Sequence, residues 1–334
     1  AYTTLGGFLA ASTTDFIQSI IMSVALIVVL IFGVETAGGI GAVIHNASEL
    51  PGYLSMTLSY DVNTGKAAPY SALTIVSTAA WGLGYFGMPH ILLRFMAIED
   101  EKKLKLSRRV ATIWVVISLF VAVFIGVIGY TMSKVGALEM LTGSNSETII
   151  VKISALLSQH GVIFALLAGV ILAGILASTM STSDSQLLAA SSAVSSDILG
   201  AFRKDSSNKN GSMAAARITL LVISVVAAFI ARNPDSSVFA IVSFAWAGFG
   251  AAFGPVVLFS LFWKRTNKWG ALAGMVCGGS MVFIWKYLIR PLGGIWNIYE
   301  LLPAFLIACA TIVIVSLLTP KPSKEIEEEF DRVA

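Results

Sequence analysis

Residues 81–97 have the sequence WGLGYFGMPHILLRFMA, an apolar stretch that glycine and proline interrupt. It belongs to a longer apolar run, about 69–97, which is long enough to cross a bilayer as a helix of ~20 residues. Inside a helix each Gly costs about 1 kcal/mol and Pro about 3 kcal/mol, so the part from Gly82 to Pro89 breaks it. Membranes tolerate such a break where the backbone lines a protein cavity, and transporters bind substrates and ions there. The stretch therefore predicts a transporter with a binding site at the break.

The aromatic residues of this stretch allow two interpretations. Trp81 and Tyr85 are four residues apart and share one face if the backbone between them stays helical. They form either the wall of a binding site or, beside a simple proline kink, a packing surface for neighbouring helices. His90 is interpreted as a hydrogen-bonded packing residue.

The composition of the whole chain indicates a membrane protein. Hydrophobic residues make up 56% of the 334 residues and charged residues only 12%, with a mean hydropathy of +0.84. An ordinary soluble domain has roughly 25% charged residues. The net charge of +3 does not suggest a nucleic-acid partner. Cys277 and Cys309 lie in apolar stretches and are expected to be inert thiols, and no motif indicates an enzyme, a metal centre or an organic cofactor.

Eight apolar stretches are long enough to span a bilayer, and they are expected to be helices because backbone groups in lipid must bond internally. They are residues 14–34, 69–97, 109–132, 161–190, 212–231, 237–262, 269–289 and 298–318. Lys and Arg are more than twice as frequent in alternate loops, which include Arg203, Lys204 and the tail after residue 318, as in the loops between them. The positive-inside rule then places this tail in the cytoplasm. The loops 35–68 and 133–160 are expected to be irregular or partly helical, and a start at Ala1, without Met, suggests a fragment.

The fourth apolar stretch ends in a polar segment, STMSTSDSQ, at residues 178–186. Ser178, Ser181, Thr182 and Ser185 have the spacing of one helix face. Hydroxyl oxygens are hard ligands that suit a hard cation such as Na⁺, and carbonyls from a broken partner helix would complete the ligand set. The alternative is that these hydroxyls bond to their own backbone at a close helix–helix interface.

Three of the charged residues in or near the predicted spans are candidates for a functional role. Asp184 falls within the polar end of the fourth stretch, and a carboxylate inside a membrane indicates a functional site. Asp15 and Arg94 lie near helix ends, where they either act in a site or sit at the interface, with Arg94 reaching the lipid headgroups.

Several segments together resemble the sodium:solute symporter family, and within it the bacterial members that carry proline. They are GGFLAASTTDFIQ at 6–18, residues 81–97, MSTSDSQLL at 180–188 and SFAWAGFGAAFGPVVLFS at 243–260. Arg265, Gly270, Ala271 and Gly274 also fit a family signature. The resemblance implies Na⁺-coupled uptake of a small amino acid, most similar to L-proline, across a bacterial cytoplasmic membrane. The resemblance implies no cofactor, with Na⁺ as the coupling ion.

The resemblance also implies the architecture: an all-α membrane protein with a LeuT-like inverted-repeat fold, of which this chain holds a part with eight transmembrane helices. Residues 1–34 would be the last helix of the first repeat and 69–262 the second repeat. Residues 269–318 would be two additional helices and 319–334 a cytoplasmic tail. The family's first five helices, with half of the ion and substrate contacts, would be missing.

Residue by residue, the resemblance assigns roles at three places. Trp81, Tyr85 and Pro89 match positions that line the substrate pocket. Ser181 and Thr182 match two hydroxyls that coordinate sodium, with a backbone carbonyl from Ser178. Asp15, Asp184 and Ser185 match a second sodium site found in some members, although Asp184 stands where Ser is common in the family.

Two other functions remain open. The cargo is either proline or another small organic solute, which competition for uptake would separate. A protein of the same fold can also sense a solute without moving it. Some relatives of this fold are fused to signalling kinase domains, whereas only sixteen residues follow the last predicted span here, so transport is favoured.

Overall fold

A computed structural model of the chain describes residues 2–61, 64–198, 209–232 and 237–333. The chain divides into two compact units, and each is made of two separate stretches of sequence. Unit 1 comprises Ala1–Ala68 and Ile98–Asp235, and unit 2 comprises Pro69–Ala97 and Ser236–Ala334. The basic loop predicted at Arg203 and Lys204 lies outside the described residues.

Unit 1 begins with the long helix α1, Tyr2–Thr36, which has one break at Gly7. Gly7 has φ +60°, a value that glycine adopts without the steric cost that a Cβ would impose. After α1 come α2, Ile40–Ser48, and the strands β1, Leu58–Asp61, and β2, Lys66–Pro69, which pair as a two-stranded sheet. The loop after α1 is therefore partly helical, as expected, but it also contains a strand pair that was not predicted.

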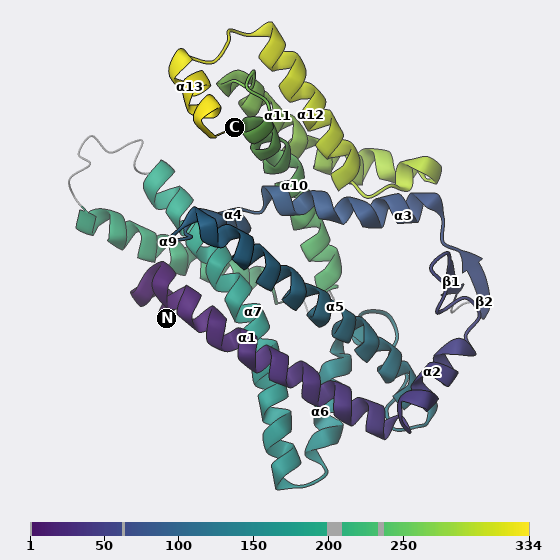
Figure 1. The fold of residues 1–334 in the computed structure, drawn as a ribbon. Helices are drawn as coiled ribbons and strands as arrows, with labels where there is room; N and C mark the ends of the chain where they lie inside the picture. Colours follow the sequence, from purple (N-terminus) through teal and green to yellow (C-terminus); the bar gives the residue numbers. More distant parts are fainter. Residues whose placement is uncertain (1, 62–63, 199–208, 233–236, 334) are drawn as a thin grey trace. The chain divides into compact units, whose positions relative to one another are not determined.

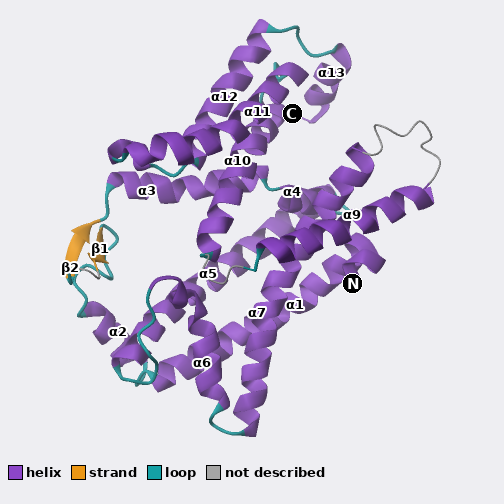
Figure 2. Ribbon diagram, turned by 180° about the vertical axis from the view of Figure 1, so that it is seen from behind, coloured by secondary structure: helices purple, strands orange, loops and turns teal. Residues whose placement is uncertain are grey.

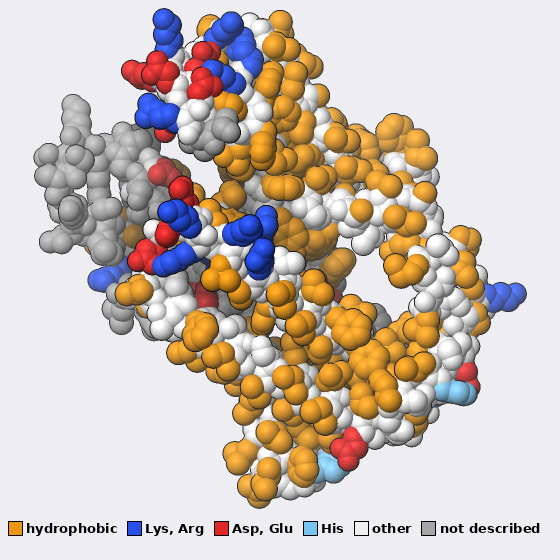
Figure 3. Space-filling model, viewed as in Figure 1, with side chains coloured by type: hydrophobic (Ala, Val, Ile, Leu, Met, Phe, Trp, Pro, Cys, Tyr) orange, Lys and Arg blue, Asp and Glu red, His pale blue; other side chains and the backbone are white. Residues whose placement is uncertain are grey.

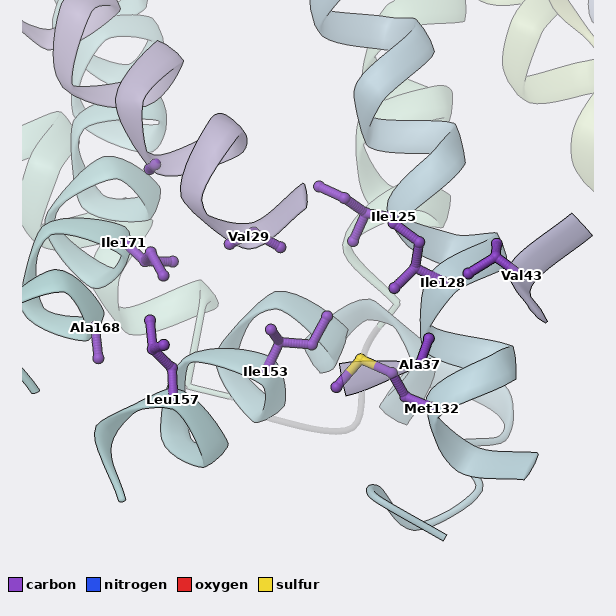
Figure 4. Packing of buried hydrophobic residues seen from close by; sticks show 11 residues of the cluster. Val29, Ala37, Val43, Ile125, Ile128, Met132, Ile153, Leu157, Ala168 and Ile171 are labelled. Carbon is purple, nitrogen blue, oxygen red and sulfur yellow. The ribbon is translucent and has the colours of Figure 1, made fainter. Parts of the chain in front are cut away.

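The second part of unit 1 consists of helices (Figure 1). In chain order they are η2, Glu101–Lys103; α5, Leu104–Lys134; η3, Gly143–Thr148; α6, Ile149–Ser158; α7, Val162–Ser192; the π-helix η4, Ala193–Ile198; and α9, Lys209–Ile230. Its buried core joins α1, α5, α6 and α7 through Val29, Ile128, Ile153 and Ile171 (Figure 4). These branched side chains bring α1 together with helices that follow it by more than 60 residues, so their burial holds the unit together.

Unit 2 contains the interrupted stretch and the last helices of the chain (Figure 2). The stretch forms α3, Ala72–Ala79; the 3-10 helix η1, Ala80–Gly87; and α4, Pro89–Met96. The rest comprises α10, Val238–Phe262; α11, Lys268–Ile284; the π-helix η5, Trp285–Ile289; η6, Arg290–Leu292; η7, Gly294–Asn297; α12, Leu301–Leu318; and α13, Lys324–Val333.

Polar side chains fix both ends of α11 and α12 within unit 2. The Asn267 side chain accepts a hydrogen bond from Gly270 N at 2.9 Å, which caps α11, and its amide donates to the Pro320 carbonyl oxygen at 2.8 Å. At the other end, Arg290 Nη1 donates to the buried Glu300 carboxylate at 2.9 Å. These contacts hold α11 and α12 together at both of their ends.

Among the described residues, six helices are long and apolar enough to cross a membrane. They are Gly6–Thr36, Glu101–Lys134, Val162–Ser195, Val238–Phe262, Lys268–Leu292 and Leu301–Leu318. Ala214–Ile230 is a shorter apolar helix, and the stretch at 69–97 is divided among α3, η1 and α4. The prediction of eight spans is thus supported at six places and stays a prediction at the other two.

The long helices expose apolar side chains in a way that fits lipid. On α5, Phe120 is 69% exposed and Val123 is 72% exposed. Figure 3 shows hydrophobic side chains covering the middle of α5, with Lys and Arg gathered near its beginning. Such a surface would be unfavourable in water but matches a hydrocarbon core bordered by a polar interface.

Candidate functional site

The polar end of α7 stays helical, and its hydroxyl groups bond to the backbone one turn earlier. Ser181 Oγ donates to the Ser178 carbonyl oxygen at 3.1 Å, and Ser185 Oγ donates to that of Ser181, also at 3.1 Å. Thr182 Oγ1 lies 3.5 Å from the same Ser178 oxygen. A hydroxyl that donates a hydrogen bond in this way keeps its lone pairs, so the three hydroxyl oxygens can still coordinate a cation. The Ser178 carbonyl oxygen, by contrast, already accepts hydrogen bonds from the Ser181 and Thr182 hydroxyls.

The pairing of α1 with α7 gives these hydroxyls their surroundings. The two helices form the most extensive contact within unit 1. Gly174 of α7 lies against Ala25 and Ile21 of α1. Val29, one turn further along α1, belongs to the same buried cluster as Ile171, one turn back along α7 (Figure 4). The helices therefore run antiparallel, and this half of their interface is apolar.

The other half of the same interface is polar. Asp15 lies ten residues before Ala25, and Asp184 lies ten residues after Gly174. At 1.5 Å per residue, both are about 15 Å along their helices from the apolar contact, in the same direction because the helices are antiparallel. Asp15, Asp184 and Ser185 are all half-buried. The pairing thus places the three candidates for a second ion site at one level of one unit.

Gln18 belongs to this polar half, although it was not identified from the sequence as a candidate site residue. It lies one turn after Asp15 on α1, at the level of Ser181 on α7, and its Oε1 atom is buried. The signal was the i, i+3 spacing of Asp15 and Gln18, which puts them on one face of α1. An amide oxygen is a suitable ligand for a hard cation.

The substrate candidates lie in unit 2, where glycines bring η1 against α10. A Cβ added to Gly87 would overlap backbone atoms of Phe249 and Gly250, and one added to Gly250 would lie 2.7 Å from Gly84 Cα. Gly84 and Gly87 therefore lie where η1 closely approaches α10, whereas a Cβ added to Gly82 would meet no atom within 4 Å. Pro89 follows the break as the first residue of α4, where its missing N–H costs nothing.

The aromatic candidates take part in a ring cluster. The Trp81 ring is stacked on Phe239 at 5.6 Å, on Trp246 at 5.4 Å and on Tyr299 at 6.0 Å between centroids. Tyr85 meets the Trp246 ring edge-on at 4.8 Å and keeps 48% of its surface exposed. Trp81 thus has the packing contacts that one interpretation expected, while Tyr85 retains a free face.

The remaining polar candidates, His90 and Arg94, both lie on α4, where His90 is half-buried and Arg94 is exposed. Within the described ranges, no three His, Cys, Asp or Glu side chains gather in the way that a transition-metal centre needs. Cys277 and Cys309 are free thiols.

Comparisons with known proteins now identify the family. The sequence profile of the sodium:solute symporter family matches residues 1–278. The chain is 38% identical over 323 residues to the osmoregulated proline transporter OpuE of Bacillus subtilis. The aligned region covers 97% of this chain and 62% of OpuE. It is 39% identical over 338 residues to the sodium/proline symporter of Haemophilus influenzae, with 99% and 64% covered.

The sodium/proline symporter of Escherichia coli is similar to the same extent, with 37% identity over 330 residues, 98% of this chain and 62% of the symporter. The chain thus spans a little under two thirds of the length of these relatives. A profile match over most of the sequence, together with apolar helices of membrane-spanning length, makes it a multi-pass membrane protein. The chain belongs to the sodium:solute symporter family.

Proposed function

We propose that the protein containing this chain is a sodium-coupled symporter of L-proline. The observation that carries the proposal is the similarity over 97–99% of the chain to relatives that are named proline transporters or sodium/proline symporters. The interrupted segment supports it, since η1 presents an aromatic side chain with a free face beside a backbone break. Proline is compact and apolar, and its ring suits an aromatic wall.

Within this proposal, unit 1 binds the coupling ion. Ser181 and Thr182 supply hydroxyl oxygens to the main sodium ion, whose remaining ligands come from other parts of the protein. Ser178 contributes its carbonyl only if its present hydrogen bonds lengthen. Asp15, Asp184 and Ser185 form a second cation site, because two carboxylates at one level repel unless a cation or a proton lies between them.

Unit 2 binds the substrate in the same proposal. Tyr85 packs its exposed face against the proline ring, Trp81 supports it from the ring cluster, and Pro89 ends the break so that backbone groups near it are available to the substrate. A helix break suits this role because its backbone carbonyl and amide groups are free to bind the charged groups of an amino acid.

The proposed architecture follows the family. Residues 1–34 form the last helix of the first repeat, 69–262 the second repeat of a LeuT-like fold, 269–318 two additional helices and 319–334 a cytoplasmic tail. The protein lies in the cytoplasmic membrane of a bacterium. Basic loops on alternate sides of the spans support this orientation.

Uptake by the full-length protein in proteoliposomes tests the function. An inward Na⁺ gradient should drive accumulation of labelled L-proline, an equal K⁺ gradient should not, and excess unlabelled proline should compete. Uptake without Na⁺ dependence would contradict the coupling, and stronger competition by a different small solute would contradict the cargo.

A further inference from the structure

Trp246 of α10 contacts the interrupted segment at its backbone. Its indole Nε1 donates a hydrogen bond of 2.9 Å to the carbonyl oxygen of Trp81, in the first turn of η1. A Cβ on Gly84 would overlap the same indole. The glycine therefore makes the space in which the indole reaches the backbone of the segment.

The Trp246 ring also contacts both aromatic candidates for the substrate wall. It is stacked on Trp81 with 15° between the ring planes, and it meets Tyr85 edge-on at 85°. Stacked and edge-to-face pairs are the two favourable arrangements of aromatic rings. One side chain thus fixes the orientation of one ring by stacking and of the other by its edge.

The segment needs such support because of its own conformation. η1 is a 3-10 helix of eight residues, whereas 3-10 helices longer than three or four residues are uncommon because their hydrogen bonds are poorly aligned. Tyr299 adds a further contact: its hydroxyl donates to the Ser243 carbonyl oxygen at 2.6 Å, and its ring stacks on Trp81.

We propose that Trp246 is a positioning residue for the substrate wall, which holds Trp81 by its backbone and Tyr85 by its ring in the orientation that receives the substrate. The proposal rests on the proposed function and adds a residue outside the interrupted segment that determines affinity for the substrate. It acts through Trp81 and Tyr85.

Trp246→Phe in the full-length protein tests the proposal, because phenylalanine keeps an aromatic ring and removes the N–H donor. The KM for Na⁺-driven L-proline uptake should rise about tenfold, which corresponds to ~1.4 kcal/mol. Sodium binding measured without proline should not change. A purely structural role would instead lower the amount of folded protein and alter both quantities together.

Trp285→Phe is the matched control. Trp285 also belongs to unit 2 and, like Trp246, packs against another tryptophan, Trp296. It is buried, but its Nε1 has no hydrogen-bond partner among the described residues. Its substitution should leave the KM for proline unchanged. Equal KM changes in Trp246→Phe and Trp285→Phe, or an unchanged KM in Trp246→Phe, would overturn the proposal.

A second pair of variants decides the matter if Trp246→Phe does not fold. Gly84→Ala pushes a methyl group against the indole, whereas the methyl group of Gly248→Ala, two residues after Trp246 in the sequence, meets no atom within 4 Å. Gly84→Ala alone should raise the KM for proline, and equal effects of the two variants would refute the role of Trp246. Absence of proline uptake by the unaltered protein would refute the proposed function itself.

Discussion

Gly174 of α7 faces Ala25 of α1 at a distance that leaves no room for another carbon atom. A Cβ added to Gly174 would lie 2.7 Å from Ala25 Cβ, and real Cβ atoms essentially never come closer than 3.0 Å to another heavy atom. This contact fixes the spacing of the two helices at the apolar half of their interface. The same contact therefore sets how Asp15 of α1 and Asp184 of α7 line up in the polar half of the interface.

Gly174→Val should therefore destabilise unit 1 by about 1–3 kcal/mol, the usual cost of overpacking. It should also weaken sodium binding, because the two polar faces would no longer meet at the same distance. The control is Gly169→Val on the same helix, where an added Cβ has nothing within 4 Å. Thermal unfolding of the full-length protein in detergent measures the difference in stability between the two variants. Equal melting temperatures would show that the Gly174–Ala25 contact does not limit the spacing of the helices.

Ser181→Ala and Thr182→Ala should each raise the Na⁺ concentration for half-maximal uptake. The loss of one oxygen from a buried polar contact costs about 1–3 kcal/mol. Ser183→Ala is the control, because Ser183 lies in the same segment but about 200° round the helix from Ser181. If sodium dependence is unchanged in both test variants, the assignment of the main ion site is wrong.

Tyr85→Ala should weaken proline binding about tenfold while leaving sodium binding in the absence of proline unchanged, since an aromatic contact contributes about 0.5–1.5 kcal/mol beyond its buried area. Phe86→Ala serves as the comparison, because Phe86 is the adjacent residue and is similarly exposed at 42%. Binding isotherms for both ligands separate the two effects. Equal losses of proline and sodium affinity would indicate a structural role for Tyr85.

Asp15→Asn and Asp184→Asn should have non-additive effects on sodium dependence if one cation lies between the two carboxylates. Groups that share a ligand typically show interaction energies of about 0.5–3 kcal/mol in a double-mutant cycle. The cycle consists of the two single variants and the double variant, each measured for Na⁺-driven uptake. Strictly additive effects would support two separate interfacial aspartates.

Arg290→Ala should destabilise unit 2, because it leaves the Glu300 carboxylate, only 2% exposed, without its ion-pair partner. Breaking a buried pair costs about 3–5 kcal/mol, and the partial exposure of Arg290 places this case near the lower end. The double variant Arg290→Met, Glu300→Leu removes both charges and should recover most of the melting temperature. A double variant as unstable as Arg290→Ala would show that the charges are not the cause.

The sequence was most informative where apolar residues run without interruption. The expected stretches 161–190 and 237–262 correspond to α7 and α10 within two residues at each end. The break between Gly82 and Pro89 was also predictable, since glycine and proline act locally. The first span was less exact: it was expected to begin at residue 14 but begins at Gly6, because the small and hydroxyl residues before Asp15 remain helical.

Contacts between distant segments could not be read from the sequence. Spacing along α1 places Asp15 and Gln18 on one face, but only its antiparallel packing shows that this face meets α7. The role of Trp246 was hidden for the same reason, since it lies 165 residues after Trp81. The strand pair after α2 has few residues of high β propensity, so its sequence carries little sign of strands.

The glycine contacts of the two units differ in whether evolution or an engineer can repair them. A substitution at Gly174 collides first with a side chain, so Ala25→Gly can return the lost space. A substitution at Gly87 collides with backbone atoms of residues 249, 250 and 254, which no shorter side chain can move away. A suppressor screen should therefore recover second-site revertants for Gly174 at the contact itself, whereas Gly87 variants should regain activity only by reversion to glycine.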